Sequence, residues 1–312
     1  MQTLHSLYGI SLKSQWHLPF PPSNDGELAQ VTLQEFPRPF SARAFRQASN
    51  LSGHDRWFRC FSLADGSTYL RWSGLFEFLV SPDGRDIFGR RLTRGTLAAF
   101  HTYLLNQVLS TALLKQGIES LHSTCVVVGG QGVAFLGDCG YGKSSLGAVF
   151  VRAGFSLLTD DLLVVARRGP ALYAFPGAPR IKLFPRVARC ILNNGVHGVA
   201  MNNITAKLVI PLEKHQVHQS AVPLKAIYVL RPPSVRKASK KISIRPLSQR
   251  RAFLELVKNT FNDLNLESDR LRRQFGLATT IASEIGVKSL SYPRALSSLP
   301  SVREAILADL RR

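Results

Sequence analysis

Runs rich in aromatic and β-branched residues, separated by polar turn residues, occupy the first third of the chain. Residues 56–72 and 75–92 each place an Asp-Gly pair between two such runs. This composition favours strands, and Asp-Gly between two strands is typical of a tight hairpin turn. The pattern predicts two β-hairpins in a β-rich N-terminal region.

A helical pattern follows from Thr96 to Lys115. The apolar residues spaced at helical intervals on one stripe are Leu97, Phe100, Leu104, Val108 and Ala112. Gly117 stands where a helix would end, since glycine readily adopts the left-handed conformation of a C-terminal cap. We expect this helix to pack against the β-rich region, so that residues 1–117 form one domain and residues 118–312 another.

The second region begins with a different pattern. Two short apolar runs flank Gly129–Gly132, and the second run, residues 133–136, leads directly into GDCGYGKSS at residues 137–145. A helix to about Arg152, a strand at 155–158 and a further strand after Asp160-Asp161 are predicted next. Later segments predict an irregular surface region at 193–222, a strand at 224–230, and helices around 250–285 and 301–311. The fold class is α/β.

The glycine-rich segment matches G-x-x-x-x-G-K-[ST], the P-loop (Walker A) pattern, at residues 137–144. Backbone N–H groups of such a loop surround nucleotide phosphates, the lysine adds a cation, and the hydroxyl that follows can ligate Mg²⁺. A structural glycine-rich turn is the alternative, but the position between a predicted strand and a predicted helix favours ATP and Mg²⁺ binding. The predicted nucleotide-binding residues are Gly137, Asp138, Cys139, Gly140, Tyr141, Gly142, Lys143, Ser144 and Ser145.

Two acidic residues follow the next predicted strand, at Asp160 and Asp161. A carboxylate near a phosphate loop can bind Mg²⁺ or accept a proton from the substrate. Adjacent residues at a strand end point to opposite sides, so the two carboxylates are expected to differ in role. A turn formed by the Asp-Asp pair is the alternative.

The order and spacing of these motifs resemble a known family. His122, the hairpin, the loop, the helix and LLTDD are similar to the catalytic domain of bacterial HPr kinase/phosphorylase. They are closer still to HPr-kinase-like proteins, including peptide serine kinases encoded with some lasso-peptide genes, which also carry a segment like PGAPRIKL at residues 176–183. The resemblance covers roughly residues 118–312. It implies a nucleotide-binding core of the phosphoenolpyruvate-carboxykinase type and ATP-dependent transfer to a serine hydroxyl.

The resemblance also implies roles for single residues. Asp160 resembles the carboxylate that accepts the hydroxyl proton, and Asp161 a carboxylate associated with the metal together with Ser144, although the two aspartates are exchangeable on this reasoning. His122 resembles a histidine near the phosphates, with a structural histidine as the alternative. The match departs from HPr kinases at Ser145, where those enzymes usually have Glu, so HPr itself is not the expected acceptor.

Two cations alternate on a predicted strand in the PGAPRIKL segment. Arg180 and Lys182 could therefore face one side and neutralise a transferring phosphoryl group, unless they are ordinary surface cations. Both are predicted catalytic residues.

Composition limits the remaining choices. The 312 residues are 45% hydrophobic and 19% charged, which excludes a disordered chain, and the net charge of +20 favours anionic partners such as an acidic peptide. The four cysteines form no CxxC pair, and no signal or membrane segment is evident, so a soluble cytoplasmic protein is expected. A small-molecule kinase, an ATP-binding protein without kinase activity and, through the basic stretch at 231–251, a nucleic-acid-associated protein stay open as alternatives, as does a homo-oligomer.

Overall fold

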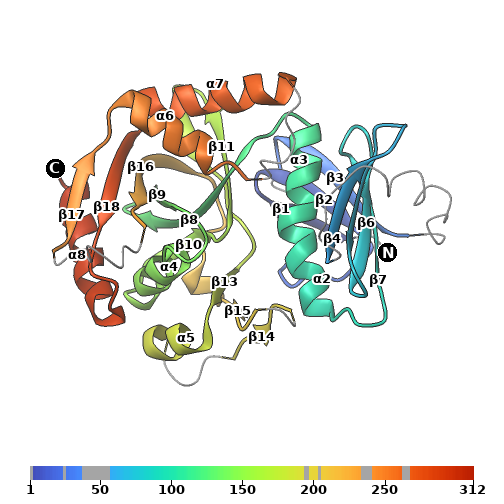
Figure 1. The fold of residues 1–312 in the computed structure, drawn as a ribbon, viewed down its shortest axis with the longest axis horizontal. Coiled ribbons are helices and arrows are strands. Elements are labelled where there is room, and N and C mark those ends of the chain that lie inside the picture. Colours follow the sequence, from blue (N-terminus) through green and yellow to red (C-terminus); the bar gives the residue numbers. More distant parts are fainter. Residues whose placement is uncertain are drawn as a thin grey trace. The chain divides into compact units, whose positions relative to one another are not determined.

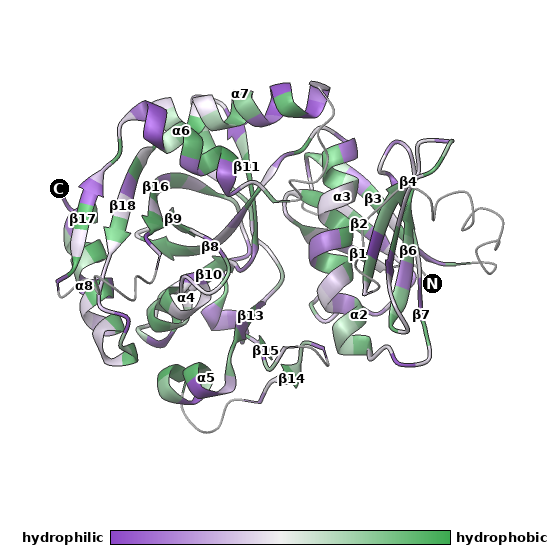
Figure 2. Cartoon of the chain, viewed as in Figure 1, coloured by the Kyte–Doolittle hydropathy of each residue, from purple (hydrophilic) through white to green (hydrophobic). Residues whose placement is uncertain are grey.

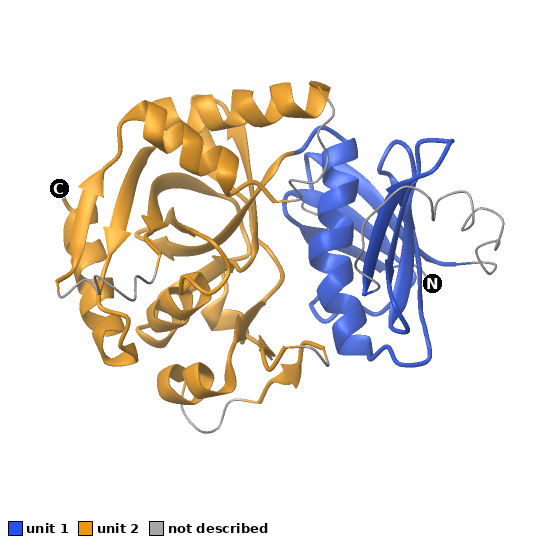
Figure 3. Cartoon of the chain, viewed as in Figure 1, with its two compact units in different colours: residues 1–118 blue, residues 119–312 orange. Residues whose placement is uncertain are grey.

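A computed structural model describes residues 3–23, 26–36, 57–192, 197–202, 205–232, 241–261 and 268–312. The chain divides into two compact units, Met1–Ile118 and Glu119–Arg312 (Figure 3). This division lies one residue after the boundary expected from the sequence. Within the described residues, none of the helices combines the length and apolar character that a membrane span requires.

Unit 1 is built on a seven-stranded sheet (Figure 1). In sheet order its strands are β1 (Thr3–Leu7), β2 (Ile10–Ser14), β3 (Ala29–Glu35), β7 (Asp86–Arg91), β6 (Phe76–Val80), β5 (Thr68–Trp72) and β4 (Phe58–Ser62). The pairs β4–β5 and β6–β7 are antiparallel, which confirms both predicted hairpins. The sequence analysis did not anticipate β1, β2 and β3 individually, or the parallel pairing of β3 with β2 and β7.

The predicted helix of unit 1 is present in three parts. These are α2 (Leu97–Tyr103), a π-helical turn η1 (Leu104–Val108) and α3 (Leu109–Lys115). Thr96 caps the start through its hydroxyl, and Gly117, at φ +80°, follows the end. Phe100, Leu104, Val108 and Ala112 are buried as expected, but Leu97 is 50% exposed. The prediction for Leu97 was wrong because this residue opens the first turn, where side chains pack less than in the middle of a helix.

Unit 2 contains an eight-stranded sheet in which the pairing closes on itself. Five strands form the closed circuit, each paired with the next: β8 (Ser120–Val128), β9 (Gln131–Leu136), β16 (Val222–Leu230), β12 (Ala171–Ala174) and β11 (Leu162–Arg168). The other strands extend it: β10 (Ser156–Thr159) pairs with β8, while β18 (Gly286–Ser291) pairs with β16 and β17 (Ser243–Pro246). The two strands predicted on either side of Gly129–Gly132 are confirmed as β8 and β9.

Side chains of the central strands are buried on both faces. Along β9, Val133 and Phe135 join one hydrophobic cluster, whereas Ala134 and Leu136 join another. Figure 2 shows β8, β9 and β16 mainly in the colour of hydrophobic residues. The first cluster lies under α4 (Lys143–Arg152), α5 (Pro185–Leu192) and α8 (Leu299–Leu310), and the second under α6 (Gln249–Lys258) and α7 (Ser268–Glu284). This packing fixes the end of β9, from which the glycine-rich loop emerges.

The region from 193 to 222 has more structure than an irregular surface segment. It contains β14 (Val199–Ala200), β15 (Leu208–Pro211) and the 3₁₀ turn η2 (Lys214–Gln216), and β15 pairs with both β14 and β13 (Arg180–Leu183). Short strands of this kind are stabilised by pairing with strands distant in the sequence, so their local sequence predicts them only weakly. Of the basic stretch at 231–251, residues 233–240 lie outside the described residues, while 243–246 form β17.

Candidate active site

The segment predicted as a P-loop connects β9 to α4, as the sequence pattern requires. Gly137, Gly140 and Gly142 adopt positive φ angles of 142°, 85° and 95°, which residues with a side chain rarely tolerate. A Cβ atom at Gly142 would also lie 2.8 Å from the hydroxyl oxygen of Tyr292. The loop therefore needs glycine at this position both for its backbone conformation and for space.

Asn259 holds the loop to the strand beside it. Its side-chain oxygen accepts a hydrogen bond from the backbone N–H of Gly137 at 2.9 Å, and its carbonyl oxygen accepts one from the backbone N–H of His122 at 2.7 Å. Asn259 is buried at the C-terminal end of α6. Sequence reasoning missed this residue because it lies more than a hundred positions from the loop, and the chain there shows no motif.

Lys143 folds back onto the loop. Its ammonium donates hydrogen bonds to the carbonyl oxygens of Gly137 at 2.5 Å and Asp138 at 3.2 Å. Burial lowers the pKa of Lys143 to about 8, and the Asp160 carboxylate opposes this shift. The side chain thus carries a positive charge that backbone carbonyls solvate in part, ready for an anion in the loop.

Asp160 is enclosed by hydrogen-bond donors. Its Oδ1 atom accepts from the hydroxyls of Ser144 at 2.9 Å and Thr124 at 2.6 Å. Its Oδ2 atom accepts from the backbone N–H of Lys182 at 2.9 Å, and the residue is 6% exposed. Asp160 is therefore tied to Ser144, the loop hydroxyl predicted to bind metal.

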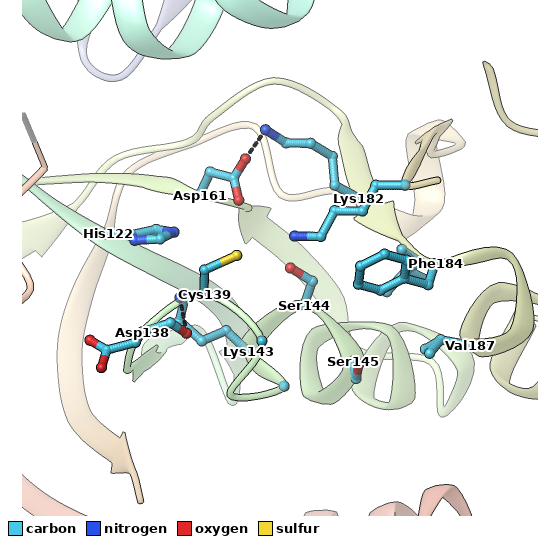
Figure 4. A pocket seen from close by; sticks show the side chains of 14 residues that line it. His122, Asp138, Cys139, Lys143, Ser144, Ser145, Asp161, Lys182, Phe184 and Val187 are labelled. Carbon is cyan, nitrogen blue, oxygen red and sulfur yellow. Dashed lines mark hydrogen bonds and ion pairs between the residues drawn. The ribbon is translucent and has the colours of Figure 1, made fainter. Parts of the chain in front are cut away.

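Asp161 has a different environment. Its backbone adopts the left-handed conformation with φ 76°, unusual for a residue other than glycine, and its side chain points into the cleft beside the loop. The carboxylate forms an ion pair with the Lys182 ammonium, marked by the dashed line in Figure 4. The expectation that the two carboxylates would face different surroundings agrees with this arrangement.

Arg180 and Lys182 both lie on β13, and neither is a surface cation, since they are 7% and 6% exposed. Lys182 lines the cleft, whereas Arg180 is not among the described residues that line it. Burial lowers the pKa of Lys182 to about 8, opposed by the Asp160 carboxylate.

The cleft collects further positive charge. Lys207, just before β15, lines it together with Lys143 and Lys182, and its charge lowers the pKa of both. His122 lines the same cleft, where burial and the neighbouring lysines lower its pKa to about 3. The imidazole is therefore neutral at neutral pH. Lys207 was not predicted, because the pairing of β13 with β15 that brings it here is a long-range contact.

The cleft has a volume of about 180 Å³, and four parts of the chain besides the loop line it. Its lining residues are His122, Asp138, Cys139, Gly140, Gly142, Lys143, Ser144, Ser145, Asp161, Lys182, Leu183, Phe184, Val187 and Lys207. Most of the residues predicted from the sequence are thus brought together here.

The donor set suits a nucleoside triphosphate with Mg²⁺. Glycines at positive φ, the N-terminus of α4 and three lysines can surround phosphate oxygens. Ser144 and Asp160 supply the hard oxygen donors that Mg²⁺ prefers, and this ion commonly uses one or two protein ligands together with substrate phosphates. The residues present fit both groups.

No protein-family model matches the chain, and no curated protein matches it. Among solved structures, the chain is similar to the HPr(Ser) kinase/phosphatase from Coxiella burnetii, with 15% sequence identity over 62% of this chain and 95% of that chain and a TM-score of 0.34. This TM-score is too low for the fold or the function of the present chain to be inferred from that protein.

Proposed function

We propose that the chain is an ATP-dependent kinase that transfers the γ-phosphoryl group to a serine hydroxyl of a peptide or protein. The observation that carries the proposal is the pairing of Ser144 with Asp160 at the base of the loop while Asp161 faces the same cleft. A metal site and a second carboxylate that lines the same cleft as the phosphate loop are the parts that phosphoryl transfer requires.

The geometry favours an exchange of the aspartate roles given by the family resemblance. Asp160 already contacts Ser144, and its three hydrogen bonds hold the carboxylate in one orientation beside that hydroxyl, which suits a metal site. Asp161 borders open volume and suits a base. Ser144 and Asp160 would hold Mg²⁺, and this ion would neutralise charge on the phosphates.

In this scheme Asp161 takes the proton of the acceptor hydroxyl while the oxygen of that hydroxyl bonds to the γ-phosphorus. The bond from that phosphorus to the bridging oxygen breaks, and ADP leaves. Lys182, already beside Asp161, has a phosphoryl oxygen as its alternative partner, so the incoming phosphate frees the carboxylate. Lys143 and Lys207 neutralise the other phosphate oxygens.

An acidic serine peptide is the acceptor that the charge of the chain suits best. The net charge of +20 attracts acidic partners at long range and speeds their association. A nucleic-acid role has electrostatic support alone, because no recognisable nucleic-acid-binding motif accompanies the charge.

The test is phosphorylation of a serine-peptide library of varied charge with Mg²⁺ and ATP, read by mass spectrometry. The wild-type protein should add phosphate to serine and prefer acidic peptides, while Lys143→Ala should lose ATP binding and transfer together. ATP binding without transfer to any peptide, or transfer to small hydroxyl compounds instead, would contradict a peptide kinase. The melting temperature of each protein is also measured with and without ATP. If ATP raises it equally in the wild-type protein and in Lys143→Ala, the assignment of the loop as the phosphate site is contradicted.

A further inference from the structure

The two ends of the cleft differ in chemistry. In Figure 4, His122 and Asp161 lie at one end, and Phe184 and Val187 at the other. Phe184 is 45% exposed, and of the large hydrophobic side chains that are exposed among the described residues, it is the one that lines the cleft. An aromatic surface therefore stays open to solvent next to a site built for phosphates.

Lys207 connects this aromatic surface to the phosphate end. Its ammonium lies 5.6 Å from the centroid of the Phe184 ring, within the range of a cation–π contact. The charge of Lys207 also acts on Lys143 at the end of the loop and on Lys182 of β13, and both of these lysines line the cleft. A ligand that extends from the loop to Phe184 would pass Lys207 on the way, so an anionic group is favoured midway and a flat apolar group at the end.

The size of the cleft agrees with such a ligand. Its volume of about 180 Å³ is below the roughly 300–1,000 Å³ of pockets that enclose a whole drug-sized ligand. A chain of phosphates fits inside, and the remainder of a nucleotide has to lie at the mouth. Because Asp161 marks the end at which the phosphoryl group leaves, the nucleoside belongs at the opposite end, where Phe184 is exposed.

We propose that Phe184 is the platform on which the base of the bound nucleotide stacks, with Lys207 contacting the phosphate next to the ribose. This inference rests on the proposed function, since it takes the phosphates to occupy the loop. Stacking on an aromatic ring tolerates every base, so Phe184 supplies affinity for a nucleotide over a base-free polyphosphate rather than a choice among nucleotides.

The test compares a ligand with a base to one without. Calorimetric titration with ADP and, separately, with inorganic pyrophosphate, both with Mg²⁺, is carried out on the wild-type protein, Phe184→Ala, Phe184→Trp and Phe275→Ala. Phe275 is the matched control because it is also 45% exposed but lies on α7, outside the cleft lining. A fifth protein, Lys143→Ala, reports on the loop.

We expect Phe184→Ala to weaken ADP binding about tenfold and to leave pyrophosphate binding unchanged. Phe184→Trp should keep ADP affinity, and Phe275→Ala should change neither ligand. Unchanged ADP affinity in Phe184→Ala overturns the inference, and if the KM for an acceptor peptide rises instead, the ring contacts the acceptor. Equal weakening of both ligands also overturns it, since Phe184 would then support the loop.

Failure of the proposed function looks different. If the wild-type protein binds neither ADP nor pyrophosphate, or if Lys143→Ala binds both as well as the wild type does, the loop is not the phosphate site and both proposals fall. If both ligands bind through Lys143 and Phe184→Ala has no effect on ADP, the stacking platform alone is wrong.

Discussion

Buried charge is handled in opposite ways at two sites, one in each unit. In unit 1, Glu77 is 3% exposed and is satisfied by the Tyr69 hydroxyl and the Arg90 guanidinium, each at 2.5 Å. In unit 2, Lys143, Lys182 and Lys207 converge on one cleft, and burial lowers the pKa of the first two to about 8. The charge of Glu77 is neutralised within the fold of unit 1, whereas the cleft of unit 2 holds cations that the fold compensates only in part.

This difference indicates where buried charge costs the ligand-free protein stability. A buried charge that a neighbour neutralises contributes to the structure, but like charges gathered without full compensation cost free energy in the ligand-free protein. Clusters of this kind are typical of functional sites, because the ligand supplies the missing charge. Phosphates are the anions that the loop geometry suits.

The largest effect is expected at Asp161, the proposed base. Asp161→Asn should lower phosphoryl transfer by about 10²–10⁴-fold with little change in ATP affinity, because the amide cannot accept a proton. Asparagine tolerates the left-handed conformation of this residue, so the backbone at φ 76° should persist. Single-turnover transfer and ATP binding are measured on the same preparation.

Asp160→Asn is the paired control for that variant. Asp160 contacts Ser144, so replacing its carboxylate with the asparagine amide should weaken ATP binding in the presence of Mg²⁺. The same replacement should change metal-free ATP binding less. The opposite pattern, with binding lost in Asp161→Asn and transfer lost in Asp160→Asn, would restore the roles that the family resemblance implied.

The sequence predicted local features of the site better than its assembly. The loop, the acidic pair and Lys182 were all predicted, because each follows a strand or lies on one whose pattern is readable over a few residues. Asn259 and Lys207 were not, since both reach the cleft through long-range contacts, one from the end of α6 and one through the pairing of β15 with β13. The exposure of Phe184 follows from tertiary packing and has no signal in its neighbours.

The same distinction holds for the fold. Both Asp-Gly hairpins are confirmed because the turn residues and the adjoining strands lie together in the sequence. The closed circuit of strands in unit 2 was not predicted, because β16 joins β9 and β12 through long-range pairs that lack a connecting turn. The π-helical turn inside the predicted helix likewise arises where local spacing gives no indication of it.

A smaller effect is expected when the neutralised charge of unit 1 is disturbed. Glu77→Gln should destabilise unit 1 by about 2–4 kcal/mol, because Arg90 loses its buried partner, although solvent around the partly exposed arginine limits the cost. The tryptophans of the chain, Trp16, Trp57 and Trp72, all lie in unit 1. Urea unfolding followed by tryptophan fluorescence therefore reports on this unit.

Exposed Glu35 of β3 provides the control, and Glu35→Gln should leave the transition unchanged within about 0.5 kcal/mol. ADP affinity of the folded Glu77→Gln protein should equal that of the wild type. A loss of ADP affinity with an unchanged fluorescence transition would show that the charge of Glu77 serves the nucleotide site, and the contrast between the two units would fail.

The smallest effect concerns pH and follows from the lowered pKa of Lys143. The lysine loses its proton at about pH 8 in the folded, ligand-free protein but near its ordinary pKa of 10.5 in the unfolded chain. Between these values the unfolded chain binds more protons, so the free energy of unfolding rises with pH. The penalty of the buried charge is fully present below pH 8 and is relieved above it, by about 1 kcal/mol between pH 8 and pH 9.

Pyrophosphate affinity should move in the other direction over the same pH range. A bound phosphate needs the protonated lysine, so binding weakens as pH rises above about 8 while the ligand-free protein becomes more stable. Lys143→Met removes the titrating group, and the rise in stability from pH 8 to pH 9 should then be about 1 kcal/mol smaller than in the wild type. Thermal unfolding across this range measures the first quantity, and calorimetric titration the second. If stability and pyrophosphate affinity instead rise together above pH 8, the cleft cations carry no penalty before a ligand arrives, and the cleft would neutralise its buried charge as completely as the Glu77 site does.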